Sequence, residues 1–93
     1  MTEDTYETRL GTLFKFGFEE ENAGFIIHIL EQPAYGNRAD DLVSTHRLTT
    51  SNGHRLCWTE KIKTLKDAKN IAGVWSDLTE NYILTGEKFP TPH

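Results

Sequence analysis

Apolar residues recur at every second position early in the chain. Within residues 10–18, phenylalanines occupy positions 14, 16 and 18. This period of two is typical of a strand that buries one face. Residues 23–31 are apolar on both faces, which favours a central strand that is covered on both sides at least in part. The polar residues 19–22 between these runs predict a turn, so the two strands would form a hairpin.

A second hairpin is predicted in the middle of the chain. Residues 42–50 are rich in β-branched side chains, and residues 54–59 form another short strand-like run. The sequence Ser51-Asn52-Gly53 lies between them, and Asn-Gly favours a type I′ turn because both central residues adopt positive φ. A turn centred on these two residues would place Arg47 opposite Trp58, with the guanidinium over the indole ring.

The C-terminal third predicts one long amphipathic helix. Thr64 and Asp67 resemble a capping box, with Asp in place of the usual Glu, and Gly86 suits the left-handed backbone that ends a helix. The opposite, polar face includes Gly73, an unfavourable residue inside a helix. The apolar face carries residues at three- and four-residue spacing: Leu65, Ala68, Ile71, Ala72, Trp75, Leu78, Thr79 and Tyr82.

These elements predict an α+β fold in the order β-β-β-β-α. We expect a small four-stranded, mainly antiparallel sheet with the C-terminal amphipathic helix packed across it. The length of 93 residues fits one domain, which we place at residues 10–86. Residues 1–9 would form a flexible acidic tail, and residues 87–93 a C-terminal tail.

Composition and charge narrow the class of protein. The single cysteine, Cys57, cannot form an intrachain disulfide, and the acidic N-terminus does not resemble a signal peptide. The longest apolar run is too short to cross a bilayer, so we expect a soluble, cytoplasmic protein. Residues 1–45 carry three basic and nine acidic side chains, whereas residues 46–93 carry seven basic and five acidic ones. The basic residues are therefore concentrated in the second half.

The connection between the two predicted hairpins is the leading candidate for a binding surface. It spans residues 32–41 and carries polar side chains that a turn alone does not need. Tyr and Arg are enriched among the residues that dominate the energy of protein interfaces. We therefore expect a protein-binding adaptor or regulator whose contact is carried by Gln32, Tyr35, Arg38 and His46.

Gly73 suggests a second contact surface on the outer face of the helix. A glycine in mid-helix costs about 1 kcal/mol relative to alanine, and close approach of another chain would explain it. The expected partner is an unidentified protein, with a homodimer as an alternative.

A nucleic-acid-binding module is the alternative function. The second hairpin and the start of the helix carry cationic and aromatic side chains, which neutralise phosphates and stack on bases. The acidic N-terminal half would repel a polyanion, so protein binding remains the leading expectation. The expected nucleic-acid contacts are Arg47, Arg55, Trp58 and Lys61.

The sequence contains no recognisable motif for catalysis, for a cofactor or for a metal. His28, His46 and His54 lack the spacing of a structural zinc site. Cys57 lies within a predicted strand, away from the helix N-termini and loops where thiols are usually activated. We therefore expect neither an enzyme nor a bound cofactor or metal.

Overall fold

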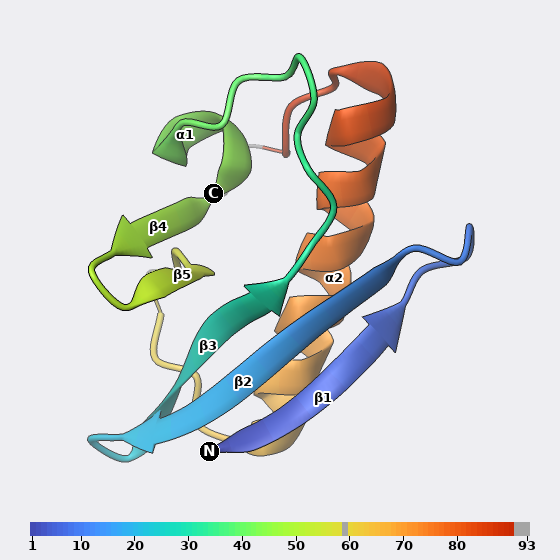
Figure 1. Cartoon of the computed structure of the whole chain (residues 1–93). Coiled ribbons are helices and arrows are strands. Elements are labelled where there is room, and N and C mark those ends of the chain that lie inside the picture. Colours follow the sequence, from blue (N-terminus) through green and yellow to red (C-terminus); the bar gives the residue numbers. More distant parts are fainter. Residues whose placement is uncertain (59, 91–93) are drawn as a thin grey trace.

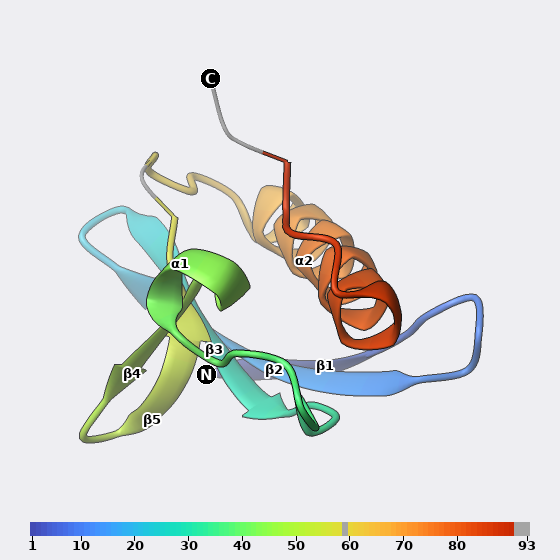
Figure 2. The same ribbon diagram turned by 90° about the horizontal axis from the view of Figure 1, so that it is seen from above.

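A long helix packs across one face of an antiparallel sheet in the computed structural model of this chain, which describes residues 1–58 and 60–90 (Figures 1 and 2). This arrangement confirms the α+β class and the C-terminal helix. The described sheet has five strands, one more than expected, in the order β1-β2-β3-β5-β4. The elements are β1 (Thr2–Glu7), β2 (Leu13–Glu21), β3 (Gly24–Glu31), α1 (Leu42–Thr45), β4 (Arg47–Thr50), β5 (Gly53–Leu56) and α2 (Leu65–Thr85).

The additional strand is β1, in a region that was expected to be a flexible tail. It pairs with β2 along its whole length, from Thr2 opposite Phe18 to Glu7 opposite Leu13. Only Tyr6 of β1 is half-buried, so no apolar alternation marks these residues as a strand. The tail prediction is therefore wrong for residues 2–7. The edge of β2 supplies backbone hydrogen-bond partners whatever the side chains of β1 are.

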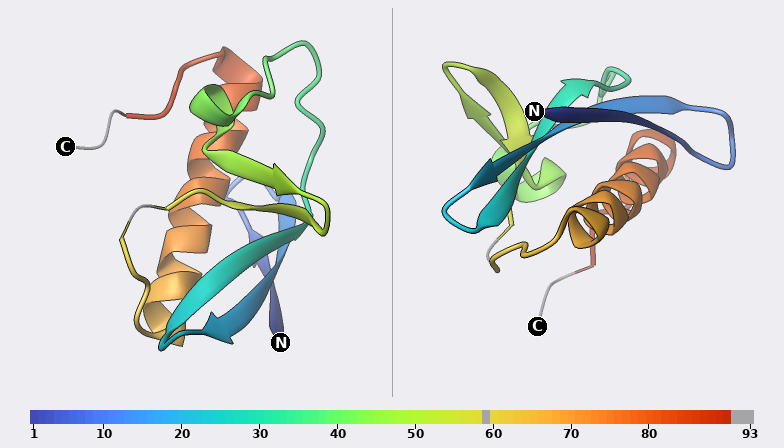
Figure 3. Two further views of the ribbon diagram at one scale, coloured as in Figure 1. Left: turned by 90° about the vertical axis from the view of Figure 1, so that its left-hand side faces the viewer. Right: turned by 90° about the horizontal axis from the view of Figure 1, so that it is seen from below.

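The predicted first hairpin is formed by β2 and β3. Asn22 and Ala23 occupy the turn with φ of 51° and 62°, the positive values that a type I′ turn requires. The turn lies later than expected because β2 runs on through Glu21. The three phenylalanines of β2 are buried, as their spacing predicts. The helix lies on one side of the sheet only, so the expected cover on the second face of β3 is not seen in the described residues (Figure 3).

Residues 42–45 form helix α1, not the beginning of a third strand. The Asp41 carboxylate accepts a hydrogen bond from the Ser44 N–H at 3.3 Å and thereby caps the helix. The helix ends at His46, whose φ of 52° is left-handed. The prediction of a strand over residues 42–50 is therefore wrong for its first half. The local cap outweighs the strand preference of the β-branched residues.

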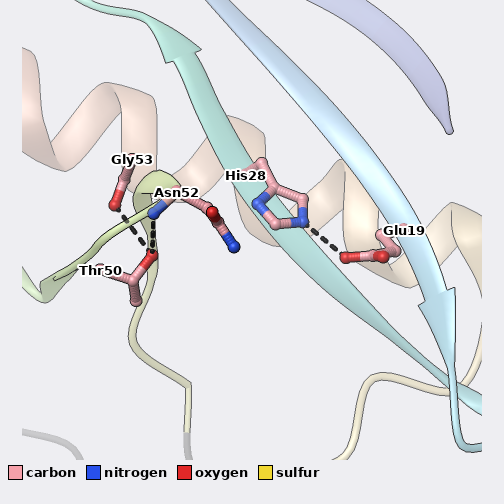
Figure 4. A network of polar contacts seen from close by, with 5 residues as sticks. All are labelled: Glu19, His28, Thr50, Asn52 and Gly53. Atoms are coloured by element: carbon pink, nitrogen blue, oxygen red, sulfur yellow. Dashed lines mark hydrogen bonds and ion pairs between the residues drawn. The ribbon is translucent and has the colours of Figure 1, made fainter.

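The second hairpin forms with a register that differs by two residues from the predicted one. Thr50 pairs with Gly53 across the turn, so Arg47 is not opposite Trp58. Gly53 has a φ of 118°, whereas Asn52 does not adopt the positive φ that the predicted turn needs. Figure 4 shows the Thr50 Oγ1 atom accepting from the Asn52 N–H and donating to the Gly53 carbonyl, both at 3.2 Å.

Helix α2 begins and ends where the sequence predicts. The Thr64 hydroxyl accepts a hydrogen bond from the Asp67 N–H at 3.0 Å, and Gly86 ends the helix with a φ of 78°. Trp75 packs edge-to-face against Phe14 and Phe16, with ring centroids 5.9 and 6.1 Å away. Aromatic rings bury large areas, which a chain of this size needs for a stable core.

The chain continues past α2 and returns toward α1. The ring of Phe89 stacks on that of His46 with centroids 4.8 Å apart. At least this part of the expected C-terminal tail, residues 87–93, therefore packs against the domain. Residues 91–93 lie outside the described residues.

Candidate binding site

The 32–41 loop packs against the C-terminal end of α2. Arg38 donates from Nε to the Ile83 carbonyl at 3.1 Å and from Nη2 to the Leu84 carbonyl at 3.3 Å. The last carbonyls of a helix lack partners within the helix and carry partial negative charge, so a guanidinium there is stabilising. The Tyr82 hydroxyl donates to the Ala39 carbonyl at 2.7 Å. The loop and the helix are thus joined by hydrogen bonds in both directions, with Arg38 of the loop and Tyr82 of the helix as donors.

Tyr35 and Gln32 also face into the fold. Tyr35 is only 8% exposed and packs edge-to-face on Tyr82, with centroids 6.2 Å apart. The Arg47 guanidinium lies 4.9 Å from the centre of the Tyr35 ring and donates to the Gln32 Oε1 at 3.1 Å. Burial raises the pKa of the Tyr35 hydroxyl above its ordinary value. The cation–π contact predicted for Arg47 is therefore made with Tyr35, not with Trp58.

His46 and Gly73 lie apart from this cluster. The His46 ring is half-buried under Phe89. Gly73 is buried, and the nearest side chain to it is Tyr6 of β1. Gly73 was expected on an exposed polar face, and that expectation is wrong because β1 covers this part of the helix. The contact with Tyr6 explains the glycine without a partner chain.

The five residues predicted to bind a protein therefore have internal contacts in three separate places. Three of them, Gln32, Tyr35 and Arg38, hold the loop, whereas His46 and Gly73 pack elsewhere. These contacts account for the polar side chains that made the loop a candidate. Whether the loop also binds a partner stays a prediction.

A cleft opens where β5 separates from β3. The two strands pair at only two positions, His28 opposite Arg55 and Ile29 opposite His54. The strand predicted over residues 54–59 ends at Leu56 as β5, and Thr59 of that prediction lies outside the described residues. β3 therefore continues toward its N-terminal end without a paired neighbour from β5.

Two backbone hydrogen bonds define the limits of the cleft. The Cys57 N–H donates to the His46 carbonyl at 2.9 Å, which keeps the chain beside β4 and away from β3. The chain returns to β3 at Ile62, whose carbonyl accepts from the Phe25 N–H at 2.8 Å. The space between has a volume of about 320 Å³ and is open to solvent.

The cleft combines an apolar floor with a charged rim. Trp58 is 50% exposed, and Ile26 and Leu48 are half-buried. Leu48 pairs with Arg55 and Arg55 with His28, so Leu48 lies on the same sheet face as His28 and Ile26, opposite to the buried Ile27 and Ile29 that face α2. The remaining apolar lining residues are Phe25, Ile27, Leu56, Cys57 and Ile62, and the charged ones are Glu21, Arg55, Glu60 and Lys61. Three of the four predicted nucleic-acid contacts, Arg55, Trp58 and Lys61, thus line one cleft, whereas Arg47 lies on the other face of the sheet.

Arg55 is the half-buried charge of this cleft. In the part of the chain that the structure describes, no carboxylate lies within 4.0 Å of it. The residue opposite Arg55 on β3, His28, is itself in contact with a carboxylate, because its Nε2 atom lies 2.8 Å from the Oε1 atom of Glu19 (Figure 4). Glu21 and Glu60 are exposed.

Sequence reasoning missed Ile26 and Leu48 as functional candidates. The signal lies in the apolar residues on the second face of the 23–31 strand, a face that the pattern predicts to be covered. With that face open, Ile26 lies in the cleft wall, and Leu48 joins it from β4 because the strand pairing places it beside Arg55.

Among residues 1–58 and 60–90, the side chains form no group of three or more His, Cys, Asp or Glu suited to a metal ion. Within the same residues, no helix has the length and apolar character needed to cross a bilayer. No protein-family model matches the chain, and neither a curated protein nor a solved structure is significantly similar to it.

Proposed function

We propose that this chain is a protein-binding adaptor or regulator that holds its partner in the cleft between β3 and β5. The observation that carries this proposal is the half-exposed Trp58 at the rim of an open, apolar-floored cleft. Trp and Arg are the residues most often responsible for binding energy at protein interfaces, and they act best beside apolar surface that excludes water. The cleft offers both types of residue.

The cleft is a better candidate than the 32–41 loop because two of its side chains, those of Trp58 and Arg55, are not already engaged in polar contacts with the described residues. Tyr35 is buried and Arg38 holds the helix end, so a partner would have to break internal contacts to reach them. Trp58 and Arg55 have no such internal hydrogen bonds among the described residues.

Capture from an extract of the source organism tests the proposal. Immobilised wild type would be compared with Trp58→Ala and with Arg9→Ala, a matched control on an exposed residue between β1 and β2. Wild type and the control should recover the same partner, whereas Trp58→Ala should recover roughly tenfold less, as expected for a hot-spot residue. Equal recovery with all three proteins, each shown to be folded by circular dichroism, would exclude the cleft.

Nucleic-acid binding is the second candidate, because Arg55, Trp58 and Lys61 line the same cleft. Trp58 would stack on a base, and the two cations would meet phosphates. The carboxylates of Glu21 and Glu60 in the same lining oppose a polyanion, which makes this candidate weaker. If the cleft binds nucleic acid, a fluorescent single-stranded oligonucleotide should bind to the protein at low salt, and its affinity should fall steeply as salt is added.

A further inference from the structure

We infer that the ligand of the cleft is an extended segment of a partner protein in which an acidic side chain pairs with Arg55 and a neighbouring apolar side chain packs on Trp58. This inference rests on the proposed function of the cleft. It adds the chemistry of the partner, which can fail while the cleft remains a protein-binding site.

The charge argument starts from Arg55. Its side chain is half-buried in the cleft without an ion pair or a hydrogen bond to the described residues. A partly desolvated guanidinium gains most from a carboxylate, because its planar fork donates two parallel hydrogen bonds to the two oxygens. Glu19 is already engaged by His28, and Glu21 and Glu60, which line the same cleft, are exposed and form no ion pair with Arg55 within 4.0 Å. No carboxylate of the described residues therefore pairs with Arg55, and we assign that role to the partner.

The apolar neighbours of Arg55 determine the rest of the ligand. Leu48 is directly opposite Arg55 in the β4–β5 pairing, and Ile26 lines the same cleft from β3. Both are half-buried, and Trp58 beside them is half-exposed. An aliphatic or aromatic side chain of the ligand would cover these groups and remove apolar area from water.

The shape of the cleft favours an extended segment over a helix. β5 pairs with β3 only at His28 and Ile29, so the cleft runs along a stretch of β3 that has no paired neighbour from β5. An extended segment can lie along such a strand edge and direct alternate side chains into the cleft. A nucleic acid is disfavoured because its repeated phosphates would pass Glu21 and Glu60, while a peptide can place one carboxylate at Arg55 alone.

A library of random dodecapeptides displayed on phage supplies the probe. It would be selected on the full chain, and the enriched peptides would be made with acetylated and amidated ends, so that no terminal carboxylate is present. The inference expects an Asp or Glu near an aliphatic or aromatic residue in these peptides. Fluorescence polarisation should show roughly tenfold weaker binding to Arg55→Gln and little change with Arg9→Gln.

The pairing itself is tested by changing both sides of the contact. Replacing the acidic residue of the peptide by its amide should cost about as much affinity as Arg55→Gln, and the two changes together should cost little more than either alone. Arg55→Lys keeps the positive charge but lacks the planar fork, so it should bind the peptides with intermediate affinity. It also replaces Arg55→Gln as the test variant if Arg55→Gln does not fold.

The outcomes separate the inference from the proposed function. Peptides that need Trp58 but lack acidic residues and bind Arg55→Gln normally would overturn the inference and leave the cleft as a binding site. Peptides that bind Trp58→Ala and Arg55→Gln as well as wild type, or no enrichment at all, would count against both. An oligothymidylate that displaces the peptides and binds more tightly than they do would assign the cleft to nucleic acid instead.

Discussion

The ring of Tyr6 on the edge strand β1 lies directly against Gly73 in the middle of α2. A Cβ atom placed on Gly73 would be 3.1 Å from the Tyr6 Cε1, which is closer than side chains normally approach. The Tyr6 hydroxyl donates to the Asp77 carboxylate at 3.0 Å and so holds the ring in this position. The glycine therefore makes room for the only half-buried side chain of β1.

This contact predicts that the effect of Gly73→Ala depends on Tyr6. Alanine stabilises a helix interior by about 1 kcal/mol relative to glycine. We expect this gain in a Tyr6→Ala background and expect it to be reduced or reversed in the wild type, where the new methyl group meets the ring. Urea unfolding of the four proteins in the double-mutant cycle measures the difference. An equal gain in both backgrounds would show that the ring moves aside without cost.

Arg38 is predicted to stabilise the end of α2. Arg38→Ala removes two charge-assisted hydrogen bonds to the Ile83 and Leu84 carbonyls, and we expect a loss of about 1 kcal/mol because the guanidinium is exposed. Arg9→Ala removes the same charge elsewhere on the surface and should change the midpoint of urea unfolding little. If both variants unfold at the wild-type midpoint, the contacts of Arg38 contribute nothing to stability.

Tyr35 is predicted to act through its ring and not through its hydroxyl. The Tyr35 oxygen is buried without a hydrogen-bond partner among the described residues, so Tyr35→Phe should unfold at or slightly above the wild-type urea concentration. Tyr35→Ala should lose about 3 kcal/mol or more, because it removes an aromatic ring packed on Tyr82. A marked destabilisation by Tyr35→Phe would mean that the hydroxyl is satisfied in solution.

His54 is predicted to make the protein less stable in mild acid. Burial lowers the pKa of His54 below its ordinary value of 6.5, and the positive charge of Arg47 lowers it further. The unfolded chain therefore takes up the proton first as the pH falls. The stability that neutral His54 provides is fully present above about pH 6.5 and is lost as the pH falls from there through the lower folded-state pKa.

The change in unfolding free energy between pH 7.5 and pH 5 measures this effect. The decrease should be smaller in His54→Gln than in the wild type, since the other titrating groups are common to both proteins. An NMR titration of the His54 ring provides an independent check. A pKa at or above 6.5 in the folded protein would contradict the prediction.

The regular parts of the fold were predictable because local patterns determine them. The spacing of Phe14, Phe16 and Phe18 marks a strand with one buried face. Thr64 and Gly86 mark the ends of α2 by backbone requirements that act within a few residues. These signals do not depend on what the rest of the chain does.

The rest depended on contacts between distant residues. Strand β1 exists because β2 offers it a backbone edge, and Arg38 finds its partner 45 residues away at the Ile83 carbonyl. The register of the second hairpin differs by two residues from the predicted one, and for this reason the Arg47 guanidinium lies over the ring of Tyr35 and not over that of Trp58. The cleft followed from where β5 leaves β3, a separation that no residue pattern marks.

The acidic residues of β1 have a consequence for the behaviour of the protein at high concentration. An edge strand presents unpaired backbone groups to which a strand of another molecule can add, and this route leads to aggregation. Glu3, Asp4 and Glu7 all lie on this strand. Lys15 pairs with Glu3 and Lys69 with Asp4, whereas Glu7 has no ion pair with the residues that the structure describes. Edge-to-edge pairing of two copies would bring these carboxylates together and is opposed by their repulsion. The charges that suggested a disordered tail thus protect an ordered edge.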